Sequence, residues 1–244
     1  MVRCPAHSCP ATPALTDTPY HHGHLRETLI ASALALEPEH GALGLSLRQV
    51  AKHAGVSHAA VYHHFENKEA LVVGVARSGF ARLLMEMDIE LDRAPDAFFA
   101  LVMLGAEYLR FAFGNPSLFR FMYISVPAGD DVRDDPLAAE HDAVLARFRR
   151  AVECAQAGAL IKRGPAVRPA AQFWGLAHGL ASLTVSGAID GAPAGRKDRK
   201  SDAQRQRRAF DLVRSAMVGL MFGMRAADSA WTPGPPGTNG AMLP

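Results

Sequence analysis

Apolar residues recur every three or four positions through most of the chain, which is the period of an amphipathic helix. The pattern predicts helices over residues 24–37, 47–54, 58–65, 68–91, 96–113, 117–124, 137–158, 169–188 and 203–226. No segment has the alternation of a convincing strand, so the predicted fold class is all-α. The helix over 68–91 would be about 36 Å long at about 1.5 Å per residue, which is long enough to connect two domains.

Local signals mark the ends of the first helices. Pro38 and Gly41 are expected to end the first helix or to make its last turn irregular. Ser46 is a good N-cap for the next helix, and Gln49, three residues later, completes a capping box. The sequence therefore predicts a helix that begins at residue 47.

The residues around Gly55 have the pattern of a helix-turn-helix. Gly55 supplies the left-handed residue that ends one helix, and Ser57 can cap the next. Where two such helices cross, a small residue and an aliphatic one are needed, and Ala51 and Val61 fit these positions. Val61 and Phe65, four residues apart, should face the core, and the opposite side of this second helix should face solvent. That side presents His58, Ala59, Tyr62 and His63, on a helix expected to span about 12 Å, the width of the major groove.

The chain divides into four predicted regions. These are a flexible arm over 1–19, a helix-turn-helix domain over 20–68, a larger helical domain over 69–226 and a disordered tail over 227–244. The arm contains four prolines and no helical period, and the tail is rich in proline and glycine. A length of 244 residues suits a small domain followed by a larger one.

Composition narrows the class of protein. With 49% hydrophobic residues and a net charge of +2, the chain can bury a core, and its charge hints only faintly at nucleic acid. No apolar run is long enough for a membrane span and no leader is recognisable, so a cytoplasmic protein is expected. Phosphate loops, nucleophile elbows and zinc-protease motifs are missing, and His141 and His178 do not form a catalytic set. No enzyme activity, cofactor or metal is predicted.

Longer runs resemble a known family. The run LSLRQVAKHAGVSHAAVYHHFENKEAL resembles the signature of TetR-type transcriptional regulators, and the similarity covers about residues 20–75. The preceding YHHGHLRETLIASAL resembles a subgroup of that family. Within FWGLAHGLASL, Trp174, His178 and Gly179 resemble the Trp-His-Gly signature of a C-terminal domain found with it.

The resemblance implies a set of DNA-binding residues, namely Arg48, Ser57, His58, Ala59, Tyr62, His63, His64 and Lys68. Arg48, His58 and Ala59 would lie near base edges, where arginine can bond guanine twice and a methyl group can pack on thymine. Tyr62, His63, His64 and Lys68 would mainly contact the sugar-phosphate backbone. His64, beside Phe65, is equally well explained as a core residue.

The predicted DNA-binding domain is not basic. Between residues 20 and 70 there are four Lys or Arg against five Glu or Asp, but also eight of the eleven histidines. Histidine gains charge between about pH 5 and 8, so operator affinity is expected to rise as pH falls from about 8 to 6. Two histidine-containing segments could instead hold a metal: residues 20–24 (YHHGH), for which a phosphate-contacting arm is favoured, and Cys4, His7 and Cys9, for which a plain tail is favoured.

The second domain is expected to bind a ligand and to form a homodimer. The resemblance implies a pocket among its aromatic helices, with candidate lining residues Phe111, Met122, Tyr123, Trp174 and His178. For His178 a structural role is slightly favoured over that of a polar anchor. Small residues over 170–188, together with the apolar stripe of the last helix, suit a twofold four-helix interface. The basic run over 196–208 is interpreted as a solvated loop.

These features together predict a dimeric regulator that binds a palindromic operator and is released by a small-molecule effector. In this hypothesis the ligand displaces the long helix over 68–91 and changes the separation of the two reading helices. Repression that the ligand relieves is the expected sign of regulation; activator and co-repressor-dependent forms stay open, as do the effector and the operator sequence. A small all-helical enzyme and a helix-turn-helix used only for protein contacts are the alternatives.

Overall fold

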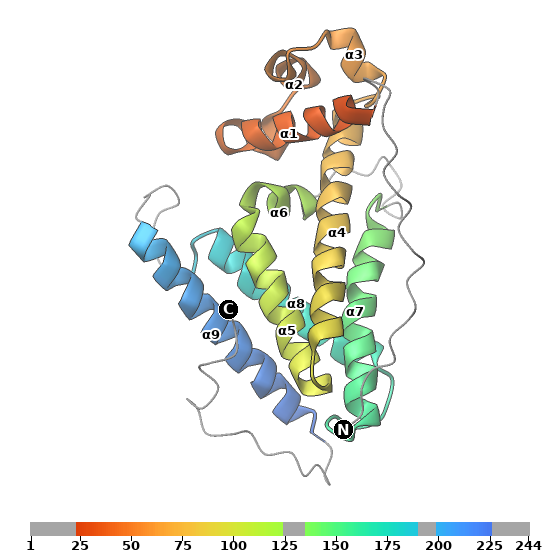
Figure 1. Ribbon diagram of the computed structural model, residues 1–244, viewed down its shortest axis with the longest axis vertical. Coiled ribbons are helices and arrows are strands. Elements are labelled where there is room, and N and C mark those ends of the chain that lie inside the picture. Colours follow the sequence, from red (N-terminus) through yellow and green to blue (C-terminus); the bar gives the residue numbers. More distant parts are fainter. Residues whose placement is uncertain (1–22, 124–134, 190–198, 226–244) are drawn as a thin grey trace.

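The computed structural model describes residues 23–123, 135–189 and 199–225, which form helices joined by short connections (Figure 1). Within these ranges the only β-type pairing is an isolated bridge between Ile161 and Arg225, so the predicted all-α class is confirmed. The predicted arm over 1–19, residues 20–22 of the YHHGH segment, the tail over 227–244 and most of the loop before residue 199 lie outside the described residues.

The first three helices form a small unit at the N-terminal end of α4 (Lys68–Arg93), seen at the top of Figure 1. They are α1 (Gly23–His40), α2 (Leu47–Ala54) and α3 (His58–Tyr62), with a 3-10 turn at Ala42–Gly44. We call this unit, together with the turn that leads into α4, the reading head. Its apolar side chains, including Leu29, Val50, Val61 and Phe65, are buried against one another and against the start of α4.

Helix α1 is longer than predicted. It continues through Pro38 to His40, so the expectation that Pro38 ends or distorts the helix is wrong, and the helix ends three residues after the predicted residue 37. A proline lacks only its own N–H, and the following turn still closes, because the N–H of Gly41 donates to the carbonyl of Glu37 at 2.7 Å. Gly41, with φ of 67°, then ends the helix, as its left-handed conformation favours glycine.

Helix α3 is shorter than the predicted 58–65, because regular helix ends at Tyr62. The N–H groups of His64 and Phe65 both donate to the carbonyl of Val61 at 2.9 Å, which closes the chain into a turn. This turn brings Phe65 into the core, where it is 2% exposed. The chain therefore buries the ring of Phe65 instead of extending α3 by another turn.

The larger part of the chain is a helical bundle. Helix α4 (Lys68–Arg93) runs from the reading head into it and is followed by α5 (Ala97–Gly114) and α6 (Pro116–Met122). The remaining helices are α7 (Ala138–Ala157), α8 (Val167–Val185) and α9 (Arg199–Gly223). The predicted helices of this region are found with their ends shifted by a few residues. The interpretation of the basic run over 196–208 as a loop is wrong from Arg199 onward, because α9 begins there.

Helix α5 is the centre of the bundle and packs against α4, α7, α8 and α9. By length and composition alone it could cross a membrane, but 56% of it is buried inside the bundle, as expected of a core helix. Close packing with α9 depends on Gly105, where a Cβ would lie 2.5 Å from Met217 Cε. Helix α5 is therefore a tightly packed core helix.

Candidate DNA-binding surface and sensor cluster

The start of α2 is formed by the predicted capping box. The N–H of Gln49 donates to Ser46 Oγ, and the N–H of Ser46 donates to Gln49 Oε1 at 2.9 Å. The helix ends at Gly55, which has the predicted left-handed conformation with φ of 69°. Ser57 then caps α3, accepting a hydrogen bond from the N–H of Ala60 at 3.1 Å. These local bonds set the angle at which α3 leaves the turn.

Helix α3 has one anchored side and one exposed side, as predicted. Val61 and Phe65 are buried. Ser57, His58, Ala59, Tyr62 and His63 are exposed. Tyr62 is half exposed, and its ring meets the ring of His58 edge to face at 4.9 Å between centroids. The two aromatic groups thus share one outward-facing surface.

The other candidate DNA-binding residues differ in their surroundings. Arg48 is exposed in the first turn of α2, whereas His64 is only partly exposed in the turn after α3. Lys68, the first residue of α4, is partly buried, and its ammonium donates to the backbone carbonyl of Leu43. A phosphate contact by Lys68 would therefore have to replace or share this internal hydrogen bond.

Two residues that hold the reading head on α4 were missed in the sequence. A Cβ at Gly74 would lie 2.6 Å from Phe65 Cε1, so only glycine lets the ring lie this close to the helix. The guanidinium carbon of Arg26 lies over the same ring, 5.3 Å from its centroid. Nothing in the sequence indicated that a glycine within a helix and an arginine near the N-terminus would both contact Phe65.

A polar cluster lies where α5, α6 and α8 meet. The hydroxyl of Tyr108 lies 2.5 Å from that of Tyr123 and 3.0 Å from Nδ1 of His178. The other ring nitrogen of His178, Nε2, lies 3.3 Å from Ser182 Oγ. Burial raises the pKa of both phenols, and burial, followed by the proximity of His141, lowers the pKa of His178. The cluster is therefore uncharged at neutral pH in these three groups.

Two further rings extend the cluster. His141 of α7 stacks on Tyr123 with 5.8 Å between centroids, and its Nδ1 is 2.9 Å from Asp135 Oδ2. Trp174 lies 6.1 Å from His141. The indole N–H lies near the two phenol hydroxyls and acts to lower their pKa, but it makes no hydrogen bond of normal geometry. His141 Nε2 is also buried without a partner.

We call Tyr108, Tyr123, His141, Trp174 and His178 the sensor cluster. It contains three of the five predicted ligand-lining residues: Tyr123, Trp174 and His178. Met122 is fully buried against Gly79 of α4, and the ring of buried Phe111 lies under Arg82, 6.0 Å from its guanidinium carbon. Tyr108 and His141 were not among the predicted lining residues. They are about 30 residues apart and come from different helices, so only the packing of the bundle brings them together.

The reading head and its arrangement define the class of protein. Two short helices joined at a glycine turn, with the second exposed on one side and mounted on a helical bundle, form a helix-turn-helix DNA-binding protein. A family model described as bacterial regulatory proteins of the tetR family matches residues 29–75, and one described as a tetracyclin repressor-like C-terminal domain matches 101–204. The chain belongs to the TetR family of transcriptional regulators.

Solved structures share this fold. A Rhodococcus sp. RHA1 protein of unknown function is 32% identical, with a TM-score of 0.67 over 86% of this chain and 100% of that one. The TetR-family regulator PfmR from Thermus thermophilus is 17% identical, with a TM-score of 0.60 over 88% of this chain and 100% of that one. At that identity the likeness to PfmR shows the fold alone.

Among curated proteins the chain is similar to the nucleoid occlusion factor SlmA of Aliivibrio fischeri, with 35% identity over 109 residues. The match covers 43% of this chain and 54% of the relative. SlmA of Vibrio vulnificus is 32% identical over 96 residues, which is 39% of this chain and 49% of that protein. The chain thus spans about half the length of the curated relatives it matches.

Proposed function

We propose that this DNA-binding regulator is a homodimeric repressor that binds a palindromic operator and leaves it when a small molecule occupies the sensor cluster. The observation that carries the proposal is the division of α3 into a buried side and an exposed aromatic side. A helix anchored in this way can enter the major groove without losing its packing. This role places the protein with the DNA in the cytoplasm.

In this proposal the exposed residues of α2 and α3 divide the work of recognition. Arg48, His58 and Ala59 contact base edges, while Tyr62 and His63 contact the sugar-phosphate backbone. Ser57, His64 and Lys68 complete the DNA-binding set, and Lys68 does so by exchanging the Leu43 carbonyl for a phosphate oxygen. Phosphate contacts position the head, and base contacts specify the sequence.

The dimer is proposed to form through α8 and α9. These helices pack on each other, and a Cβ at Gly175, Gly179 or Gly219 would meet no atom within 4 Å. Leu183 of α8 and Leu212 of α9 are 47% and 41% exposed, so both helices present apolar side chains to solvent. An open face of small and apolar residues on two adjacent helices suits a twofold four-helix interface. Dimerisation would place two reading heads over two half-sites.

The effector is proposed to carry a hydrogen-bonding oxygen attached to an apolar body. The sensor cluster offers aromatic rings for the apolar part, and the indole N–H of Trp174 is a buried donor without a bond of normal geometry. His141, with Nδ1 held by Asp135, has Nε2 free for the same polar group. Buried groups left without partners in this way call for a ligand or water to complete their bonding.

The proposal is tested by selecting bound DNA from a random pool with the purified protein, at a stated salt concentration. A palindromic consensus is expected, because a twofold dimer reads two equal half-sites. Tyr62→Ala should then abolish binding to the selected duplex while leaving the dimer intact on size-exclusion chromatography. His40→Ala, which removes an exposed ring at the C-terminal end of α1, is the control and should bind normally. Recovery of no sequence preference would contradict the proposed function, and normal binding by Tyr62→Ala would contradict the assigned surface.

A further inference from the structure

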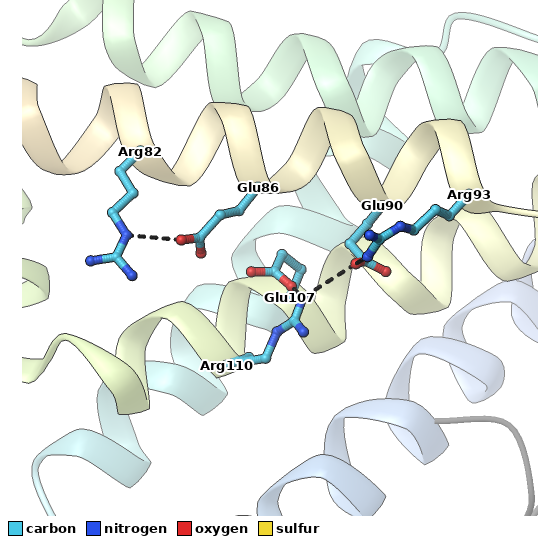
Figure 2. Close-up of polar contacts among 6 residues, drawn as sticks. All are labelled: Arg82, Glu86, Glu90, Arg93, Glu107 and Arg110. Carbon is cyan, nitrogen blue, oxygen red and sulfur yellow. Dashed lines mark hydrogen bonds and ion pairs between the residues drawn. The ribbon is translucent and has the colours of Figure 1, made fainter. Parts of the chain in front are cut away.

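Four side chains in the described ranges have buried polar atoms that make no hydrogen bond: Glu107, Glu140, His141 and Trp174. Two of these are carboxylates that an arginine neutralises. Figure 2 shows Glu107 of α5 beside Arg110, with which it forms an ion pair. Glu140 likewise pairs with Arg77 Nε at 3.0 Å. The atoms that remain are His141 Nε2 and Trp174 Nε1, and both belong to the sensor cluster.

These two nitrogens have opposite hydrogen-bonding roles. Trp174 Nε1 carries a hydrogen and can only donate. Asp135 Oδ2, an acceptor, lies 2.9 Å from His141 Nδ1, so in the neutral ring the hydrogen is on Nδ1 and the lone pair is on Nε2. The centroids of the two rings are 6.1 Å apart. A single ligand group that both accepts and donates would therefore satisfy both nitrogens.

The side chains around these nitrogens are aromatic and only partly buried. Tyr123 stacks on His141 with 5.8 Å between centroids, and the ring of His178 lies 4.3 Å from that of Tyr123. Tyr123, His141, Trp174 and His178 are each partly exposed. A flat ring can pack on such side chains by offset stacking or by edge-to-face contact. The surroundings therefore favour an aromatic ring as the body of the ligand.

The charges near the cluster favour an uncharged ligand. Burial and other members of the cluster cause the pKa shifts of Tyr108, Tyr123 and His178, and no arginine or lysine of the described chain contributes to them. The charged groups next to His141 are instead the carboxylates of Asp135 and Glu140. A ligand carboxylate would lose its water here without gaining a cation, which is costly.

We infer that the sensor cluster binds an uncharged phenol, whose oxygen accepts a hydrogen bond from Trp174 Nε1 and whose hydroxyl donates one to His141 Nε2. This inference rests on the proposed function, in which the cluster is the effector site, and it names the chemical class of the effector. An aromatic ether would satisfy Trp174 alone, and a hydrocarbon would satisfy neither nitrogen. Trp174 and His141 thus determine the specificity of the site.

The inference is tested with four probes that share a methyl-substituted ring: para-cresol, para-methylanisole, toluene and para-toluate. Para-cresol both donates and accepts, para-methylanisole only accepts, toluene does neither, and para-toluate is an anion at neutral pH. Isothermal titration calorimetry of the purified full chain, without DNA, measures each affinity. We expect para-cresol to bind about tenfold more tightly than any of the other three, because each of them leaves a buried donor or acceptor unpaired or brings an unpaired charge.

Two variants separate the acceptor from the donor. His141→Phe removes the acceptor, so it should weaken para-cresol binding by about tenfold and leave para-methylanisole binding unchanged. Trp174→Phe removes the donor, so it should weaken the binding of both probes. The matched control is His40→Phe, which replaces an exposed ring at the end of α1 and should leave every affinity unchanged.

The indole N–H of Trp174 reports its hydrogen bond directly. The chain has two tryptophans, so Trp231→Phe leaves Trp174 as the only one and its indole N–H as a single resonance in an isotope-labelled protein. Para-cresol should move this resonance downfield as the N–H donates to the phenol oxygen. Toluene should not move it in this direction.

Each result supports or overturns the inference. Equal affinity for para-cresol and para-methylanisole, tighter binding of para-toluate, or no saturable binding of para-cresol would overturn it. An unmoved indole resonance in a protein that binds para-cresol would place the phenol elsewhere and would overturn it too. If His141→Phe or Trp174→Phe does not fold, the four probes on the unaltered protein and the indole resonance still decide. Because no DNA is present, these results leave operator binding untouched, whereas failure to select a palindromic operator would contradict the proposed function.

Discussion

The close packing of Phe65 on Gly74 fixes the position of α3. Gly74→Ala would place a methyl group 2.6 Å from Phe65 Cε1 and 3.2 Å from Arg26 Nη2. The ring is an inflexible neighbour in a packed core, so it must move. Alanine in a helix gains about 1 kcal/mol over glycine, and overpacking costs about 1–3 kcal/mol, so the free energy of unfolding should fall by about 1 kcal/mol. Because Phe65 ends the turn after α3, operator binding should weaken as well.

Urea unfolding followed by circular dichroism measures the loss, and fluorescence anisotropy measures operator binding. Gly114→Ala is the control, because a Cβ there meets no atom within 4 Å, and it should not destabilise the protein. The double variant Phe65→Leu with Gly74→Ala should lose less free energy of unfolding than the sum of the two single variants, because the smaller leucine relieves the clash. Unchanged stability and affinity in Gly74→Ala would refute the argument that this contact positions α3.

Three other predictions concern caps and protonation. Ser46→Ala should lower the free energy of unfolding by about 1 kcal/mol, because it removes the hydroxyl that accepts a hydrogen bond from the N–H of Gln49. His40→Ala, which removes an exposed side chain that caps no helix, should not lower it. Burial lowers the pKa of His178 below 6.5, so as pH falls the unfolded chain takes up a proton at this residue before the folded chain does. The contribution of His178 to the free energy of unfolding should therefore be constant above that pH and fall below it. In urea titrations, His178→Gln should flatten this pH dependence. Operator affinity at fixed salt should rise as pH falls from about 8 to 6, and His58→Gln with His63→Gln should reduce the rise; equal affinity across the range would exclude histidine charge as a factor.

The predictions made from sequence succeeded where the determining contacts are local. The capping box of Ser46 and Gln49, the left-handed Gly55 and the cap at Ser57 each depend on residues within three or four positions. The exposed side of α3 followed from the same spacing, since Val61 and Phe65 are four apart. Where burial of a distant side chain intervened, as with Phe65, the end of the helix was misplaced.

Tertiary structure alone decided which residues meet at the functional sites. Tyr108, His141 and His178 come from three helices. Neither the amphipathic period nor any cap records such a pairing, because the period states only that a side faces inward and not which helix lies opposite. The order in which helices pack around α5 supplies that information. Thus the sequence by itself determined the reading head's local geometry, while the packing of the bundle determined the sensor cluster.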